Sequence, residues 1–95
     1  HVLSDDILYK KARMMMKQGK FSDAASFLEK IVSLHGFDIL GDDALFKLAE
    51  LNEEQLNNKT KAMELYQDIL TNYPGSLYTV EARKRYRILR GDVVN

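Results

Sequence analysis

Apolar and small residues recur every three or four positions in five stretches of the chain, at about 5–18, 21–35, 42–56, 59–73 and 77–90. This spacing places them along one face of a helix, whereas a strand would show alternation. Gly19, Gly36, the Pro74-Gly75 pair and Gly91 separate the stretches, and these residue types commonly end helices. In the fifth stretch, Tyr78, Ala82, Tyr86 and Leu89 fall on one stripe. The pattern predicts an all-α chain of five helices.

Short polar residues stand where four of the five helices are expected to begin. Ser4, Ser22, Asp42 and Ser76 each precede an apolar-periodic run. Their side-chain oxygens can accept hydrogen bonds from the free amides of a first helical turn, so we expect them to be N-caps. Before the fourth helix, the turn chemistry comes from Asn57, Asn58 and Thr60.

The first two stretches repeat in the next two. Leu8 and Ala12 lie 37 residues before Leu45 and Ala49, and Ala24 and Leu28 lie 38 residues before Ala62 and Tyr66. A repeat of about this length with two helices per unit is typical of helix-hairpin arrays. The alanines allow two helices to approach closely, and the larger residues fill the space between them. We therefore predict two antiparallel helix hairpins.

These positions resemble the tetratricopeptide repeat, whose pattern is Trp-x2-Leu-Gly-x2-Tyr, then Ala-x3-Phe, then Pro. The second unit is similar to it at Leu45, Leu48, Ala49, Ala62, Tyr66 and Pro74, and the first at Leu8, Ala12, Ala24 and Leu28. Lys11 and Gly36 depart from the pattern in the first unit. The resemblance implies a right-handed α-solenoid in a single domain spanning 1–95. The first repeat would occupy about 5–36, the second 42–75, and a C-terminal capping helix 77–90.

The C-terminal part also resembles the ends of bacterial envelope proteins of this repeat type. The similarity lies in Pro74-Gly75-Ser76 and in the run from Glu81 to Arg85. Those proteins include the periplasmic partner of the Tol system and outer-membrane assembly lipoproteins. The resemblance favours the periplasm or cell envelope over the cytoplasm as the compartment. His1 in place of methionine indicates a processed or excised chain.

Composition narrows the function classes. Lys plus Arg and Asp plus Glu both number 14, and this balance argues against nucleic acid or an anionic membrane as the main partner. Cysteine is absent, so the chain has no disulfide and no thiol nucleophile. Its only histidines are His1 and His35, the latter at a helix end where a cation suits the helix dipole. No serine stands in a nucleophile elbow, and no glycine-rich phosphate loop appears. We expect no enzyme, no cofactor, no metal site and no small-molecule substrate.

Charge is unevenly distributed along the chain. Five cations and no acid fall between Lys10 and Lys20, six acids and one lysine between Asp38 and Glu54, and the last helix is basic again. If the first helices of successive hairpins stack side by side, this order is self-complementary and fixes their register. The alternative is a charged docking surface. Arg83, Arg87 and Arg90 share one helical face, and nucleic-acid binding through that face is the less favoured reading. We expect Arg85 to lie away from the partner-binding groove.

The resemblance also implies a partner-binding groove lined by the first helix of each hairpin. Carried over position by position, the groove residues are Tyr9, Arg13, Met16, Phe46, Glu50 and Glu53. Chaperone-binding members of the family use Lys, Asn and Arg to clamp a carboxylate, and here Tyr9, Phe46 and Glu50 occupy such places, so a co-chaperone role is not expected. We predict a scaffold or adaptor that binds a peptide or partner protein. The alternative is a structural C-terminal cap of a longer solenoid in a multiprotein cell-envelope assembly.

Overall fold

The structure, a computed structural model, describes residues 5–35 and 41–92. These residues form five helices in the order α1 (Asp5–Lys17), α2 (Phe21–His35), α3 (Gly41–Glu54), α4 (Lys59–Asn72) and α5 (Thr79–Arg90). No strand occurs in the described parts of the chain. The all-α prediction is therefore confirmed, and each helix lies within about two residues of its expected bounds.

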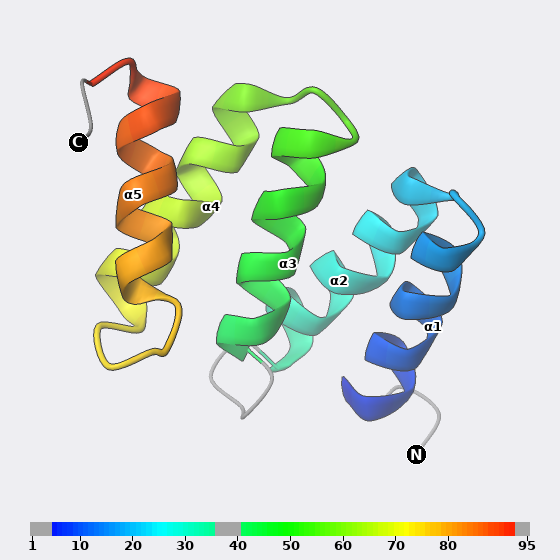
Figure 1. Ribbon diagram of the computed structural model, residues 1–95. Coiled ribbons are helices and arrows are strands. Elements are labelled where there is room, and N and C mark those ends of the chain that lie inside the picture. Colours follow the sequence, from blue (N-terminus) through cyan, green and yellow to red (C-terminus); the bar gives the residue numbers. More distant parts are fainter. Residues whose placement is uncertain (1–4, 36–40, 93–95) are drawn as a thin grey trace.

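The five helices stack in the order of the sequence. The chain runs back and forth through α1 to α5, with each helix packed on the next (Figure 1). The stack measures 44 × 29 × 17 Å, so it is a flat and elongated body. This arrangement confirms the predicted helix-hairpin repeat. Across the described residues, every helix is too short or too polar to cross a lipid bilayer.

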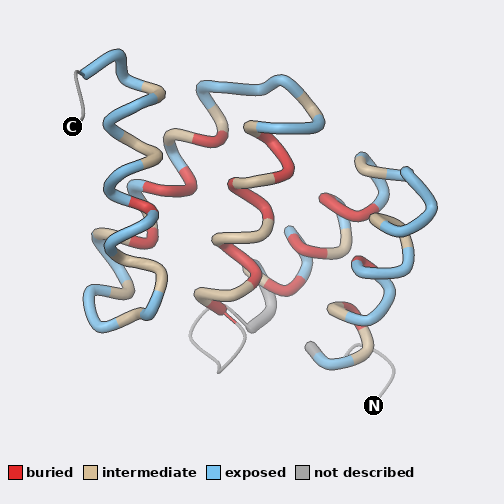
Figure 2. The backbone as a smooth tube through the Cα atoms, in the orientation of Figure 1, coloured by how far each residue is buried: buried red, intermediate tan, exposed pale blue. Residues whose placement is uncertain are grey.

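The repeat positions form the core. Leu8, Leu28, Leu45, Leu48 and Tyr66 are at most 2% exposed. The four repeat alanines are fully buried, as expected where two helices approach closely, and these are Ala12, Ala24, Ala49 and Ala62. Burial is concentrated on α2, α3 and α4, whereas α1 and α5 expose their outer sides (Figure 2). Pro74 is exposed in the turn after α4, where it stops that helix.

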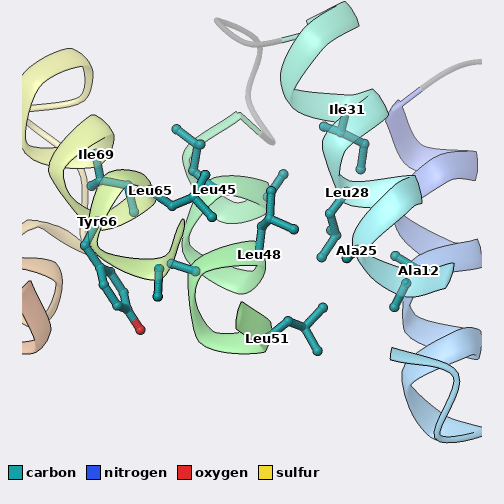
Figure 3. Packing of buried hydrophobic residues seen from close by; sticks show 14 of the residues in the cluster. Ala12, Ala25, Leu28, Ile31, Leu45, Leu48, Leu51, Leu65, Tyr66 and Ile69 are labelled. Carbon is teal, nitrogen blue, oxygen red and sulfur yellow. The ribbon is translucent and has the colours of Figure 1, made fainter. Parts of the chain in front are cut away.

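Side chains from both hairpins meet on opposite sides of α3. Leu48 and Leu51 point toward α2 and its Leu28, and Leu45 lies on the side toward Leu65 of α4 (Figure 3). The central helix is thus buried on two faces. One apolar cluster runs through all five helices, ending at Ala82 of α5.

Three of the expected N-caps are wrong. Ser22 lies inside α2, which starts one residue earlier, and the Lys20 carbonyl accepts the bond from the Ala24 amide at 3.0 Å. Asp42 lies inside α3, which starts at Gly41. Ser76 precedes α5 by three residues; its hydroxyl oxygen accepts the Tyr78 amide at 3.0 Å, ahead of the helix, and the hydroxyl donates to Asp42 Oδ2 at 2.6 Å. These helices therefore begin one or more residues away from the positions that the capping preferences favour. Ser4 and the side chain of His35 lie outside the described residues.

Other helix ends agree with the sequence chemistry. The Asn58 side chain accepts the Lys61 amide at 3.2 Å and caps α4. Gly19 and Gly91 take left-handed conformations, with φ of 75° and 97°, after α1 and α5. The next amide in each case bonds back five residues, from Lys20 to Met15 and from Asp92 to Arg87. This geometry satisfies the last carbonyls of each helix.

Candidate functional site

An open cleft lies between α1 and α3. It has a volume of about 380 Å³ and is lined by Tyr9, Arg13, Met16 and Lys17 of α1 and by Lys47 of α3. We call it the α1/α3 cleft. Because residues 9, 13, 16 and 17 recur at helical spacing, α1 turns them all to one side. Three of the six residues predicted for the groove, Tyr9, Arg13 and Met16, are therefore brought together.

The cleft combines cations with an apolar floor. Arg13 and Lys17 are exposed, and no ion pair engages either of them among the described residues. Lys47 pairs with Glu50 of its own helix at 3.3 Å. Burial, and then the nearby Asp43 carboxylate, raise the pKa of Tyr9 above its usual value, so this phenol stays neutral. The surface can accept an apolar side chain against Tyr9 and Met16 with carbonyl or carboxylate oxygens beside the cations.

A smaller cleft of about 150 Å³ continues the first toward the C-terminal end of α3. Met16 and Lys47 line both, so the two are adjacent. The remaining lining residues of the second cleft are Phe21, Glu50, Leu51, Glu54 and Gln55. Glu50, the fourth predicted groove residue, therefore stands at the boundary, where the lining changes from basic to acidic.

The α3/α5 side is closed by aromatic contacts. Phe46 stacks on Tyr78, with ring centroids 4.5 Å apart and an interplanar angle of 16°. The same ring meets Tyr66 edge-on at 5.8 Å. The Tyr78 hydroxyl donates to the Asp43 carboxylate, which with burial raises the pKa of that phenol well above its usual range. Phe46, predicted as a groove residue, is thus packed against α5.

Glu53 is engaged in the same closure. Its Oε1 accepts from the Tyr66 hydroxyl at 2.8 Å and from Arg85 Nε at 3.1 Å, and its Oε2 accepts from Arg85 Nη2 at 2.6 Å. Arg85 also reaches Glu54 at 3.4 Å. Burial and the bond to Glu53 hold the pKa of Tyr66 far above its usual value. We call these residues the Glu53 network.

Arg85, expected to lie away from the groove, is bonded to Glu53, one of the predicted groove residues, but it does not line the α1/α3 cleft. The stripe of Tyr78, Ala82, Tyr86 and Leu89 faces the core, as predicted, and Arg85 borders that stripe on the side toward α3. Its ion pairs with Glu53 and Glu54 join the acidic α3 to the basic α5, as the charge-stacking prediction expected for these two helices. No ion pair joins α1 to α3 in the parts of the chain that the structure describes.

Sequence reasoning missed Lys17 and Lys47. Lys47 follows Phe46 directly and is rotated by about 100° around the helix, so the two side chains serve different neighbours. Lys47 turns toward α1 and Phe46 toward α5. The sequence does hold one signal for Lys47: the repeat places a lysine at the corresponding position of the first hairpin, Lys10, 37 residues earlier.

Within the described residues, no three His, Cys, Asp or Glu side chains are grouped to hold a metal ion.

A tetratricopeptide repeat model matches residues 6–36 and 43–76, together more than half of the chain. These matches coincide with the α1–α2 and α3–α4 hairpins. No curated protein sequence and no solved structure matches the chain. With the two matched hairpins and their buried small-residue contacts, the chain belongs to the tetratricopeptide repeat family.

Proposed function

We propose that this module binds a segment of another protein in the α1/α3 cleft. Tetratricopeptide repeats are generally protein–protein interaction modules. The observation that carries the proposal is the contrast between the two sides of α3. On the α5 side Phe46 and Glu53 are occupied by contacts within the chain, whereas on the α1 side Tyr9, Arg13 and Met16 surround an open cleft.

The cleft favours a segment with one apolar anchor. Tyr9 and Met16 are partly buried and offer an aromatic ring and an adaptable thioether. Arg13 and Lys17 can bind backbone carbonyls or a carboxylate of the same segment. Tyr and Arg are common at the centres of interfaces because they combine apolar area with hydrogen bonding. Glu50 at the border would pair with a cation farther along the segment.

Site-specific photocrosslinking tests this proposal. A benzophenone side chain replaces Met16 in the cleft in one variant and Ser26, exposed on α2, in the matched control. Both proteins are irradiated in extract of the source organism. We expect a discrete polypeptide adduct from position 16 and none of the same mass from position 26. Tyr9→Ala in the position-16 variant should weaken the adduct.

Equal adducts from both positions would contradict the proposal. So would an adduct from position 16 that is indifferent to both Tyr9→Ala and Arg13→Glu. Thermal melts of each variant show that the fold is intact. Tyr9 is only partly buried and Arg13 is exposed, so neither change removes a core residue.

A further inference from the structure

The outer edge of α5 differs from the corresponding edge of α3. Ala82, Tyr86 and Leu89 lie 38 residues after Ala44, Leu48 and Leu51, and in each helix this stripe packs against the preceding helix. The same offset relates Leu45, Ala49 and Asn52 to Arg83, Arg87 and Arg90. On α3 this second stripe is buried, and its Leu45 lies on the side toward α4 (Figure 3). On α5 it consists of three exposed arginines, which we call the arginine edge.

Two of the three arginines are uncommitted. Neither Arg83 nor Arg87 has an ion-pair partner in the described residues. Arg90 pairs with Asp92 and its guanidinium lies 5.4 Å from the centre of the Tyr86 ring. The arginine edge therefore adjoins an aromatic side chain that faces α4.

A cleft opens beside that ring. It has a volume of about 240 Å³, is largely apolar, and is lined by Thr60, Met63, Glu64 and Gln67 of α4 and by Tyr86 of α5. In the repeat, another helix would lie against the arginine edge of α5 as α4 lies against α3, and this cleft borders that place because Arg90 lies over the Tyr86 ring that lines it. Leu77, which precedes α5, and Val80 in its first turn are also exposed, at 93% and 75%.

We propose that the arginine edge and the Met63–Tyr86 cleft form a second docking surface, which accepts an acidic amphipathic helix of another protein. The position favours a helix, because the two helices that correspond to α5 in the earlier repeats each have the next helix packed on them: α2 on α1 and α4 on α3 (Figure 1). The helices α2 and α4 present apolar residues to α1 and α3. On α5 the exposed arginines favour a partner helix with acidic residues at the corresponding positions. An apolar side chain of the partner fills the cleft, and its flanking carboxylates face Arg83 and Arg87.

This partner fits the local charge better than nucleic acid does. Glu64 lines the cleft and Asp92 pairs with Arg90, so the basic surface here is narrow and interrupted. The chain as a whole carries no excess charge. Phosphate binding draws on a broad basic surface, whereas a few arginines beside an apolar cleft suit a protein helix.

The probe is a stapled helical peptide with leucines along one face and glutamates on both flanks. Matched peptides replace every glutamate with glutamine or with lysine. Fluorescence anisotropy with the full chain measures the dissociation constants. We expect the glutamate peptide to bind and the glutamine peptide to bind roughly tenfold more weakly, the effect of losing two or three exposed ion pairs.

Charge-reversal variants locate the binding. Arg83→Glu with Arg87→Glu should abolish binding of the glutamate peptide and create binding of the lysine peptide. Lys10→Glu with Lys20→Glu makes the same change of charge on the first hairpin and should alter neither. All four positions are exposed, so the fold should persist, which a melt checks.

Three results would overturn the proposal. The first is that the glutamate peptide binds no better than the glutamine peptide or ignores the arginine reversals. The second is that duplex DNA, and not the peptide, binds in a way that the reversals abolish. The third is that the chain self-associates through this edge, which sedimentation of wild type and the arginine variant would show.

Discussion

Removal of the Glu53 carboxylate should destabilise the fold more than any other change to a charged surface residue on α3. In Glu53→Ala, the Tyr66 hydroxyl and the Arg85 guanidinium lose their shared acceptor. Tyr66 is fully buried, and its hydroxyl has no other hydrogen-bond partner in the described structure. The Arg85 side chain is 29% exposed and keeps the contact with Glu54, so water can replace most of what it loses.

The two losses differ in size. An orphaned buried hydroxyl costs about 1–3 kcal/mol. A partly exposed ion pair contributes about 0.5–1 kcal/mol after solvent screening. We therefore expect Glu53→Ala to lower the free energy of unfolding by about 2–3 kcal/mol. For a chain of this size the Tm should fall by roughly 10–20 °C.

The assay is urea denaturation followed by far-ultraviolet circular dichroism. Glu54→Ala is the matched control, because Glu54 touches the same arginine but its side chain is 51% exposed. It should cost less than about 0.5 kcal/mol. In a Tyr66→Phe background, Glu53→Ala should cost only about 0.5–1 kcal/mol, since no hydroxyl is orphaned.

Equal costs for Glu53→Ala and Glu54→Ala would refute this reasoning. So would a strictly additive cycle between Glu53→Ala and Tyr66→Phe, because it would mean that the buried hydroxyl gains nothing from the carboxylate.

Three further predictions concern the rest of the fold. The pKa of Tyr66 is raised in the folded chain, so the unfolded chain loses the phenol proton at lower pH. The free energy of unfolding should therefore fall as pH rises above the ordinary tyrosine value of 10.0, and Tyr66→Phe should flatten that fall in alkaline urea melts. Gly19→Ala should cost about 1 kcal/mol in the same melts, because Gly19 has a φ of 75° with open space around it, whereas Gly75→Ala, without a positive φ, should be neutral or slightly stabilising. Leu28→Ala, at a fully buried site, should cost about 2–5 kcal/mol, and Met14→Ala, at a site 54% exposed, less than about 0.5 kcal/mol by calorimetry.

The repeat could be predicted from the sequence because its register depends on a few small residues. Ala12, Ala24, Ala49 and Ala62 are all fully buried, and any larger side chain there would separate two helices. Their spacing is visible in the chain itself, and so is the apolar stripe of α5. The features that depend on spacing within one or two helices, the buried alanines and the apolar stripe of α5, could therefore be predicted from the sequence.

The state of the groove depends on contacts that the spacing does not encode. Phe46 and Tyr9 occupy equivalent repeat positions, 37 residues apart, yet of the two only Phe46 stacks on an aromatic ring from beyond its own hairpin within the described residues. The difference comes from Tyr78, which lies before α5 and reaches back to α3. Ser76 likewise makes a tertiary bond to Asp42 of α3, in addition to its local bond with the Tyr78 amide. Such contacts depend on the three-dimensional angle between helices, which the periodicity leaves open.

The most direct test of the binding proposal is a map of backbone amide shifts on titrating the isotope-labelled chain with a synthetic peptide. The peptide carries the partner sequence identified by crosslinking from position 16. Met16 should shift because the peptide contacts it directly. We predict that the other large shifts cluster at Tyr9, Arg13 and Lys47, while Phe46 and the Glu53 network change little. Shifts that centre on α4 and α5, with the α1/α3 cleft unaffected, would contradict the proposal.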